Sequence, residues 1–430
     1  MRSGPSWPLL SALLAGFIGF GAVVTLIGAT LPKIIADFGW SYTQAGLVMA
    51  AGAGGYLLSC LLAGPAIHHL GPRPAAVAGQ LLQAAGLALF GGSPSVAANA
   101  VLWGIVGMGQ GGIEVVTNVS VGQMEKPGQS RLMNFVHASF CVGAIVGPMA
   151  VGRILASHLS WRLPFHGMAA VAVVTAGVFA FCPFGRLLGP AGAVVPGEPD
   201  GRPGAAWSLF RQPLLALLVA VLLVYVGVEL GISAWVSEYS VKVLRFPAGL
   251  AANMVAVFWS GLLVGRVAVF FGYHGTRQAE LLCLLSAATT AILATALLLT
   301  WPPAVAAAVF ATGLACSAIY PVAMGLIGRH FAQNMSLAMA LGSAGGAVGS
   351  LLFPFLMSAL SDAAGLRNGF WFYVGLAVLM LALAICVLAA ARRRENGDAT
   401  ALLKTGKLGT HPSFRGGWDG PPKTASSHRR

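Results

Sequence analysis

Long, continuous runs of apolar residues dominate the chain, and short polar segments separate them. A transmembrane helix needs about 20 apolar residues to cross the hydrocarbon core of a bilayer. Twelve runs approach or exceed this length: 9–31, 42–63, 75–92, 97–120, 133–154, 163–182, 213–236, 249–271, 280–300, 303–327, 335–359 and 370–391. The strands of a membrane β-barrel alternate apolar and polar residues, and these runs do not. The pattern therefore predicts an all-α membrane protein with twelve transmembrane helices.

Two longer polar segments divide the chain. Residues 183–212 are rich in Pro and Gly and lack a helical period, which is typical of a linker. The segment after Ala391 opens with three arginines and continues with polar residues, Gly and Pro, which favours a disordered tail. We predict a six-helix bundle over 1–182, a cytoplasmic linker over 183–212, a second six-helix bundle over 213–391 and a basic cytoplasmic tail over 392–430.

The composition supports a membrane protein and excludes several other classes. Of the residues, 57% are hydrophobic and 9% charged, and the mean hydropathy is +0.81. These values exclude an ordinary soluble enzyme and a disordered chain. The net charge is +13, but 9 of the 25 Lys and Arg residues follow Ala391, so the charge reflects a basic tail and loops and is no nucleic-acid footprint. We expect the lipid bilayer and a small-molecule substrate as partners, no nucleic acid, and a monomer.

The distribution of basic residues favours one orientation in the membrane. An even number of spans places both termini on one side. If that side is the cytoplasm, the inner loops and ends hold 18 Lys and Arg residues and the outer loops hold 6, with Arg266 inside a helix. The outer set comprises Lys33, Arg153, Arg162, Lys242, Arg245 and Arg367. This satisfies the positive-inside rule, although most of the excess lies in the tail. We predict a multi-pass protein of the plasma (inner) membrane with cytoplasmic termini.

The sequence shows no motif for ATP hydrolysis, catalysis or metal binding. It contains no GxxxxGK[ST], HExxH or GxSxG segment, and its glycine-rich GxGxxG-like runs lie inside a span with no strand before them. The six cysteines lie in or at the end of apolar runs and none forms a CxxC, so we interpret them as apolar packing residues. We therefore expect neither an enzyme nor a resident cofactor or metal.

The two halves of the chain resemble each other weakly. Three short sequence words recur in the same order at offsets of 203, 204 and 202 residues. They are Ala45-Gly46-Leu47 with Ala248-Gly249-Leu250, Gly71-Pro72-Arg73 with Gly275-Thr276-Arg277, and Gly143…Gly147 with Gly345…Gly349. Such an offset indicates two parallel six-helix repeats related by an axis along the membrane normal.

Two motifs then resemble the major facilitator superfamily of transporters. The loop after the second span, Gly64-Pro-Ala-Ile-His68-His69-Leu-Gly71-Pro-Arg73, is similar to the family's G-x-x-x-D-R-x-G-R-R, with histidines in place of the acid and base of its charge-relay latch. The fifth span carries Gly143-Ala-Ile-Val-Gly147-Pro148, which resembles the family's G-x-x-x-G-P pattern. Glycines there allow close helix packing and the proline bends the helix. The resemblance implies the major facilitator fold and transport by alternating access, and it makes these residues gating or structural candidates.

Segments of spans 4, 5 and 7 narrow the resemblance. Residues 111–118, 131–144 and 225–239 look like the fucose–proton symporter branch and its sodium–glucose relatives. This similarity implies sugar transport driven by protons, and it leaves sodium open as the coupling ion. The fucose symporter also has an acid in its first helix. No Asp or Glu precedes Asp37 here, so a relay of two carboxylates is not expected.

Two acidic residues, Glu114 and Glu229, fall inside predicted spans, and we assign the other ten to loops, ends or the tail. An ionisable group inside a span costs a few kcal/mol and is by default a functional candidate. The alternative interpretation is a carboxylate that serves helix packing alone.

Glu114 belongs to a polar stripe on the fourth span. Gln110, Glu114 and Asn118 are spaced i, i+4, i+8 and share one face, as Asn134 and His137 do on the fifth span. Their depths match, so we predict that the two faces approach each other and that Glu114 carries the coupling proton. Amides and carboxyls also suit sugar hydroxyls, which both donate and accept hydrogen bonds. For His137, a packing role is an equal alternative.

The seventh and eighth spans hold the remaining candidates. Tyr225 lies one turn before Glu229, and Trp235 follows near the outer interface. We interpret these three as an outer gate that contacts the sugar, with an aromatic belt as the alternative for Trp235 and Tyr239. For Arg266 we favour snorkelling to the cytoplasmic headgroups. Tyr320-Pro321 and Pro354 predict local breaks that could act as hinges.

These features together favour a secondary active transporter that moves a small polar solute, a sugar, with protons coupled through Glu114. The alternative is a proton-coupled exporter of amphipathic compounds or drugs, because the G-x-x-x-G-P element is common among exporters. A receptor or a membrane-embedded enzyme fits the internal repeat less well.

Overall fold

The computed structural model describes residues 7–124, 131–184, 205–273 and 277–404. Its contacts divide the chain into two units, Met1–Leu388 and Ala389–Arg430. The described residues form helices and short connections, with no β-strand among them. The prediction of an all-α fold is confirmed.

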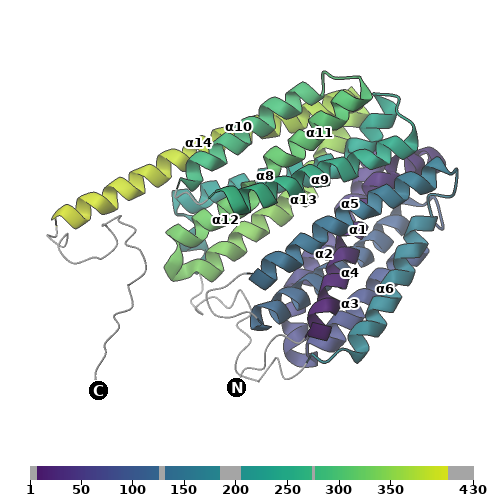
Figure 1. Ribbon diagram of the computed structural model, residues 1–430, viewed down its shortest axis with the longest axis horizontal. Helices are drawn as coiled ribbons and strands as arrows, with labels where there is room; N and C mark the ends of the chain where they lie inside the picture. The colour runs from purple at the N-terminus through teal and green to yellow at the C-terminus, as the bar shows by residue number, and fades with distance from the viewer. Residues whose placement is uncertain (1–6, 125–130, 185–204, 274–276, 405–430) are drawn as a thin grey trace, which may run out of the picture. The chain divides into compact units, whose positions relative to one another are not determined.

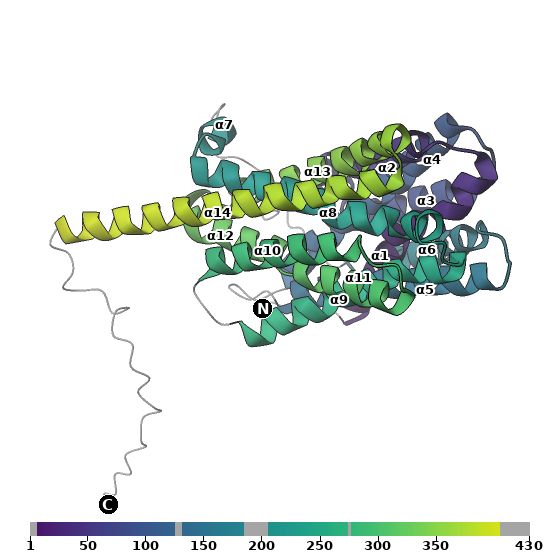
Figure 2. The same cartoon turned by 90° about the horizontal axis from the view of Figure 1, so that it is seen from above.

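Helices occupy every predicted apolar run (Figure 1). They are α1 (Trp7–Phe38), α2 (Tyr42–Leu70), α3 (Pro72–Leu89), α4 (Val96–Met124), α5 (Arg131–Ala156), α6 (Leu163–Phe181), α7 (Ala205–Phe210), α8 (Pro213–Lys242), α9 (Ala248–Gly272), α10 (Gln278–Ala296), α11 (Pro302–Cys316), α12 (Ile319–His330), α13 (Met335–Ala364) and α14 (Leu366–Lys404), with a 3-10 turn at Ala332–Asn334. We refer to α1–α6 as the N-terminal half and to α8–α14, up to Leu388, as the C-terminal half. In two views α3, α4 and α6 lie on one side, and α10 and α12 on the other (Figure 1, Figure 2).

Eleven helical segments in the described residues are long and apolar enough to cross a membrane, with α11 and α12 forming one segment, Pro302–His330. The remaining predicted span, the third in the chain, corresponds to α3, which is less apolar because it carries Arg73, Gln80 and Gln83. Both glutamines are buried where α3 packs on α4 and α6. A helix whose polar residues face its neighbours can still lie in lipid, so twelve spans remain consistent with the structure.

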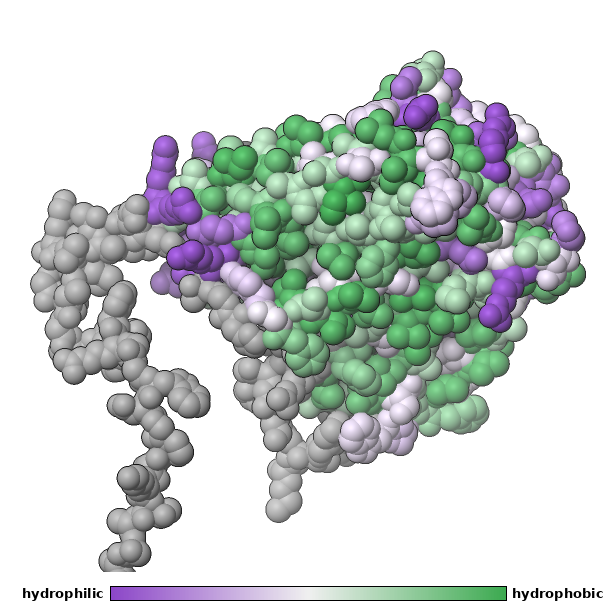
Figure 3. Space-filling view, turned by 45° about the horizontal axis from the view of Figure 1, so that its top comes forward, coloured by the Kyte–Doolittle hydropathy of each residue, from purple (hydrophilic) through white to green (hydrophobic). Residues whose placement is uncertain are grey.

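The outer surface has the character expected of a bilayer-embedded protein. On the face shown in Figure 3, hydrophobic residues cover the middle and hydrophilic residues gather toward the ends. Exposed apolar side chains include Val173, Val174 and Phe181 of α6, the last 90% exposed. A patch of this extent is stable only in contact with lipid or a partner.

The same glycine contact recurs in both halves. A Cβ atom at Gly147 of α5 would lie 3.0 Å from the Cα atom of Ala22 in α1. A Cβ atom at Gly349 of α13, the counterpart of Gly147 in the repeat, would collide with the Leu223 carbonyl oxygen of α8. Both pairs bring helix backbones close together. The packing thus follows the repeat that the sequence words indicate.

The two halves meet where α1 ends and α2 begins, which we call the distal end. There α1 packs on α8, α2 on α13, and α5 on α9. The Asp362 carboxylate of α13 accepts hydrogen bonds from the backbone N–H groups of Tyr42 (2.9 Å) and Thr43 (2.7 Å), at the first turn of α2. Gly28 of α1 lies so close to Ser233 that an added Cβ would be 2.7 Å from the Ser233 carbonyl oxygen. The distal end is therefore closed.

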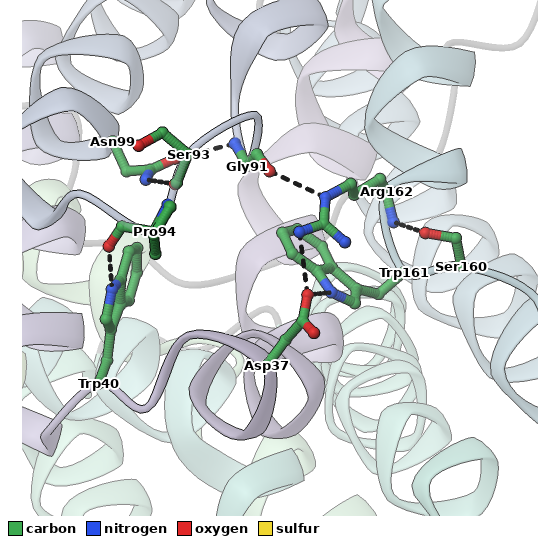
Figure 4. Close-up of polar contacts among 9 residues, drawn as sticks. All are labelled: Asp37, Trp40, Gly91, Ser93, Pro94, Asn99, Ser160, Trp161 and Arg162. Carbon is green, nitrogen blue, oxygen red and sulfur yellow. Dashed lines mark hydrogen bonds and ion pairs between the residues drawn. The ribbon is translucent and has the colours of Figure 1, made fainter.

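A polar network fastens the distal loops of the N-terminal half (Figure 4). The carboxylate of Asp37, near the end of α1, lies 2.9 Å from Arg162 Nη2 and accepts a 3.1 Å hydrogen bond from Trp161 Nε1. Arg162 Nε donates to the Gly91 carbonyl oxygen at 2.8 Å, and Gly91 N–H donates to Asn99 Oδ1 at 2.8 Å. These bonds join α1, the α3–α4 connection and the α5–α6 connection into one cap.

Some predicted boundaries are wrong. The predicted linker contains a short helix, α7, while residues 185–204 lie outside the described residues. The tail expected to be disordered from residue 392 instead continues α14 to Lys404, and the residues after it are also outside the described part. An apolar run ends where the membrane ends, but Ala, Arg, Glu and Leu still favour a helix beyond it.

Prolines end fewer helices than expected. Helix α1 continues past Pro32 to Phe38, and α13 runs unbroken through Pro354, so the break predicted there is wrong. A proline removes one N–H donor, but an apolar environment strongly favours keeping the remaining helical bonds. The break predicted near Tyr320 is confirmed, since α11 ends at Cys316 and α12 begins at Ile319.

Candidate functional site

The Glu114 carboxyl lies in the middle of α4 and binds a tyrosine of α2. Tyr56 Oη donates a 2.5 Å hydrogen bond to Glu114 Oε2. Helices α2 and α4 approach closely because both are glycine-rich here: a Cβ atom at Gly107 would collide with the Gly52 carbonyl oxygen. Both side chains are partly exposed, and Glu114 forms no ion pair among the described residues. Sequence reasoning missed Tyr56, whose only signal was a lone tyrosine in an apolar run.

The neighbouring polar residues bring α4 and α5 together. His137 Nε2 lies 3.1 Å from Asn118 Oδ1, so the predicted approach of these two residues is found. Gln110 is buried, and its amide nitrogen has no hydrogen-bond partner among the described residues. The side chain of Asn134 lies outside the described part of the structure, so its predicted role stays a prediction.

Aromatic rings surround these polar groups. The ring of Phe20 in α1 stacks on Tyr56 with centroids 6.4 Å apart, and its neighbour Phe140 of α5 meets it edge-on at 5.2 Å. Phe17 lies edge-on to His137 at 5.3 Å. The cluster thus combines hydrogen-bonding groups with apolar ring faces.

In the C-terminal half, Glu229 is paired with a base. Tyr225 Oη donates a 2.7 Å hydrogen bond to Glu229 Oε1, and Arg266 Nη2 of α9 lies 3.6 Å from the same oxygen. Arg266 Nε also donates to the Ser317 carbonyl oxygen at 3.3 Å. The snorkelling interpretation of Arg266 is therefore wrong, because its guanidinium points into the bundle. Glu229 is also deeper than predicted, since α8 continues to Lys242 instead of ending near residue 236.

Trp235 and Tyr239 do not form a lipid-facing belt. Their exposed fractions are 0% and 4%. Trp235 meets Tyr42 of α2 edge-on at 5.9 Å, and Tyr239 packs on Phe370 of α14 at 4.4 Å. The aromatic-belt alternative is wrong for both residues, and Trp235 lies at the contact between the two halves.

The two polar clusters face each other across the halves. Arg266 Nη1 lies 3.7 Å from the Cys141 sulfur of α5, and Trp259 of α9 meets Phe140 edge-on at 5.3 Å. Tyr320 of α12 packs against Tyr225, with centroids 6.5 Å apart. We call the following residues the central cluster: Tyr56, Glu114, Asn118, His137, Phe140, Tyr225, Glu229, Trp259, Arg266 and Tyr320. Both halves contribute to it, so a solute bound there would contact both.

The loop-motif residues have structural contacts away from this cluster. Gly71 adopts a φ of 86°, which favours glycine, between α2 and α3. Arg73 Nη2 donates to the Cys182 carbonyl oxygen at 3.1 Å and so binds the end of α6. Both residues act within the N-terminal half.

The sequence expectation placed Glu238 outside the spans, and that is wrong. It lies inside α8 with an exposed fraction of 0%. Neither carboxyl oxygen has a hydrogen-bond partner among the described residues. The polar residues Ser237, Glu238 and Ser240 ended the apolar run and hid the continuing helix.

Comparisons with known proteins agree with this architecture. A model of the Major Facilitator Superfamily matches residues 12–282 and 269–418. A glucose/galactose transporter of Brucella abortus biovar 1 (strain 9-941) is 27% identical over 402 residues, covering 84% of this chain and 89% of the relative. The sodium-dependent glucose transporter 1 of Danio rerio is 22% identical over 427 residues, covering 83% and 70%.

Solved structures show the same fold. A D-xylose–proton symporter superposes with a TM-score of 0.69 at 14% identity, covering 88% of this chain and 97% of the symporter. The nucleoside transporter NupG superposes with a TM-score of 0.71 at 11% identity, covering 89% and 99%. Three observations agree on one family: the helical repeat, the central cluster between the halves, and the match of the family model over most of the chain. This multi-pass membrane protein belongs to the Major Facilitator Superfamily, whose members are transporters and not enzymes.

Proposed function

We propose that the protein is a proton-coupled symporter of a small neutral sugar that works by alternating access, with Glu114 as the proton-coupling residue. In this mechanism the two halves rock about the central cluster, which opens in turn to each side of the membrane.

The contrast between Glu114 and Glu229 carries the proposal. Glu229 lies beside Arg266, so its negative charge is compensated. Glu114 has a neutral tyrosine as its hydrogen-bond partner and no paired base among the described residues. A carboxyl group in that environment is far less costly to hold in a span when it carries a proton. Glu114 can therefore bind a proton from one side and release it to the other.

The chemistry around the carboxyls suits a sugar. Tyr56, Asn118, His137 and Tyr225 supply neutral donors and acceptors, and Phe140 and Trp259 supply ring faces. Sugar rings present hydroxyls at their edges and C–H groups on their faces, so this mixture fits both. Two relatives are named as glucose transporters, which supports the same substrate class.

The distribution of basic residues supports one orientation of the protein in the membrane. With both termini in the cytoplasm of an inner membrane, the closed distal end faces outward, and the excess of Lys and Arg faces inward. Sugar entering with a proton down its gradient would then be imported.

Proteoliposomes containing a pH-sensitive dye test the proposal. Sugars are added outside one at a time, with and without sodium. We expect internal acidification on adding one sugar, loss of this signal in Glu114→Gln, and retention of sugar counterflow by that variant. Glu280→Gln, at the start of α10, is the matched control and should behave like wild type. Uptake that needs sodium and moves no protons would contradict proton coupling.

The exporter alternative has its own outcome in the same assay. Silence for every sugar, together with pH changes on adding lipophilic cations, would replace sugar symport with drug export.

A further inference from the structure

Glu238 is a buried acid that the central cluster does not include. It follows Glu229 on α8 by nine residues, or about 13 Å along the helix axis. Its side chain is fully buried, and both carboxyl oxygens lack hydrogen-bond partners among the described residues. A buried polar group without a partner requires an explanation.

The residue lies where the two halves close. The Tyr42 side chain of α2 faces the carboxyl, and its ring also meets Trp235, which precedes Glu238 by three residues. The neighbouring Ser237 Oγ donates a 3.4 Å hydrogen bond to the Ala29 carbonyl oxygen of α1. Glu238 is thus enclosed by helices of the opposite half.

Three other charged or titratable groups lie around Glu238. Tyr42 faces it from α2, and Lys242 follows it by one turn on α8 but is exposed and forms no ion pair with it. Asp362 of α13 is hydrogen bonded to the backbone of Tyr42 and Thr43. Among the described residues, the exposed Lys242 is the base that acts on Glu238, and it offsets a charge there only in part because the two form no ion pair.

We propose that Glu238 is a second proton-binding site, located in the distal gate, which takes up a proton from the distal side when the gate closes. Burying an unpaired carboxylate is very unfavourable, and a bound proton removes the charge. When α1 and α2 separate from α8, water reaches the carboxyl and the proton can leave. Closure of the distal gate therefore binds one proton at Glu238, separately from the proton at Glu114.

Proton binding at Glu238 makes closure of the distal gate depend on pH in one direction. Because the closed state holds one more proton than the open state, the ratio of closed to open molecules falls as pH rises. A single linked proton changes this ratio by up to about tenfold per pH unit. This inference rests on alternating access in the proposed function, but it needs neither a sugar nor proton coupling at Glu114.

Distances between two spin labels, measured by double electron–electron resonance in lipid nanodiscs without substrate, test the inference. The labels are placed at Ser93 in the α3–α4 connection and Thr300 in the α10–α11 connection, both exposed and on opposite halves. The six native cysteines are first replaced by serine. In the protein with Glu238 intact, we expect the fraction of closed molecules to fall with rising pH. In Glu238→Gln, which mimics the protonated acid, the distal end should stay closed at all pH values.

Two further variants keep the result interpretable. Glu238→Asp keeps a titratable acid and should keep a pH-dependent gate, which excludes a purely structural effect of substitution. Glu114→Gln should leave the pH dependence of the distal distance unchanged, even though it abolishes proton-driven uptake. An unaltered pH dependence in Glu238→Gln would overturn the proposal. Failure of sugar-driven proton uptake in wild type would overturn the proposed function and leave this gate measurement standing.

Discussion

The Arg266 guanidinium lies 3.6 Å from the Glu229 carboxylate, Nη2 to Oε1, and joins α9 to α8 in the middle of the C-terminal half. The side chain of Glu229 is 8% exposed and that of Arg266 is 33% exposed, so the pair is neither fully buried nor free in solvent. Removing one member leaves the other charge with little compensation. The pair therefore affects both the stability of the bundle and the charge that a substrate meets.

Replacing Arg266 by glutamine should destabilise the protein by about 1–3 kcal/mol, below the 3–5 kcal/mol of a fully buried pair because the guanidinium is partly exposed. Thermal unfolding of the purified protein in detergent measures the change. The double variant Arg266→Gln/Glu229→Gln should recover most of the loss, since no charge is left unpaired. If the loss in the double variant equalled the sum of the losses in Arg266→Gln and Glu229→Gln, the two side chains would not be coupled.

Removing the Tyr56 hydroxyl should uncouple protons from transport. Tyr56→Phe keeps the ring stacked on Phe20 but deletes the hydrogen bond to Glu114. A hydrogen bond to a group that becomes charged contributes about 1.5–3 kcal/mol, so proton-driven uptake should fall about tenfold or more while counterflow persists. The matched Tyr273→Phe variant, at the end of α9, should transport like wild type. Unchanged proton-driven uptake in Tyr56→Phe would remove Tyr56 from the coupling step.

Alanine substitutions of the repeat glycines should be destabilising in both halves. A Cβ at Gly143 would collide with the Ile18 carbonyl oxygen, and a Cβ at Gly349 would collide with the Leu223 carbonyl oxygen. Because these obstacles are backbone atoms, the helices must separate, and we expect a loss of about 1–3 kcal/mol in each variant. Gly177→Ala on α6 is the control, since nothing lies within 4 Å of its added Cβ. Thermal unfolding compares the three variants directly.

The helices could be predicted from the sequence because lipid imposes a simple requirement on every span. Apolar length located each of the twelve runs, and the repeated glycines marked positions of close helix packing on α5 and α13, but not the helices that they contact, α1 and α8. The errors in the prediction concern the ends of helices. Where polar residues continue a helix, as Glu238 does in α8, apolar length alone stops too early.

The central cluster was only partly accessible to the same reasoning. Helical spacing and depth were enough to bring Asn118 to His137, because one short connection joins α4 and α5. Partners on helices distant in sequence were not predictable. Tyr56 binds Glu114 across 58 positions, and Arg266 reaches Glu229 across a helix connection, and periodicity within one helix cannot encode either pairing.

The Asp362 carboxylate provides a last prediction, because it caps α2 across the two halves. It accepts hydrogen bonds from Tyr42 and Thr43 N–H groups at 2.9 and 2.7 Å, and a negative charge at a helix N-terminus is further stabilised by the helix dipole. Removing such a cap costs about 1 kcal/mol. In Asp362→Ala this loss falls only on the closed state, so the ratio of closed to open molecules should drop about fivefold at constant pH.

Asp37→Ala is the matched control for Asp362→Ala. It removes a distal carboxylate whose partners, Arg162 and Trp161, both belong to its own half. It should lower thermal stability by less than about 1 kcal/mol, since the ion pair is exposed, and leave the distal distance between spin labels unchanged. If both variants opened the distal end equally, the capping bonds of Asp362 would not be what holds the halves together. If only Asp362→Ala opened it, the gate would be stabilised by a helix cap contributed from the opposite half.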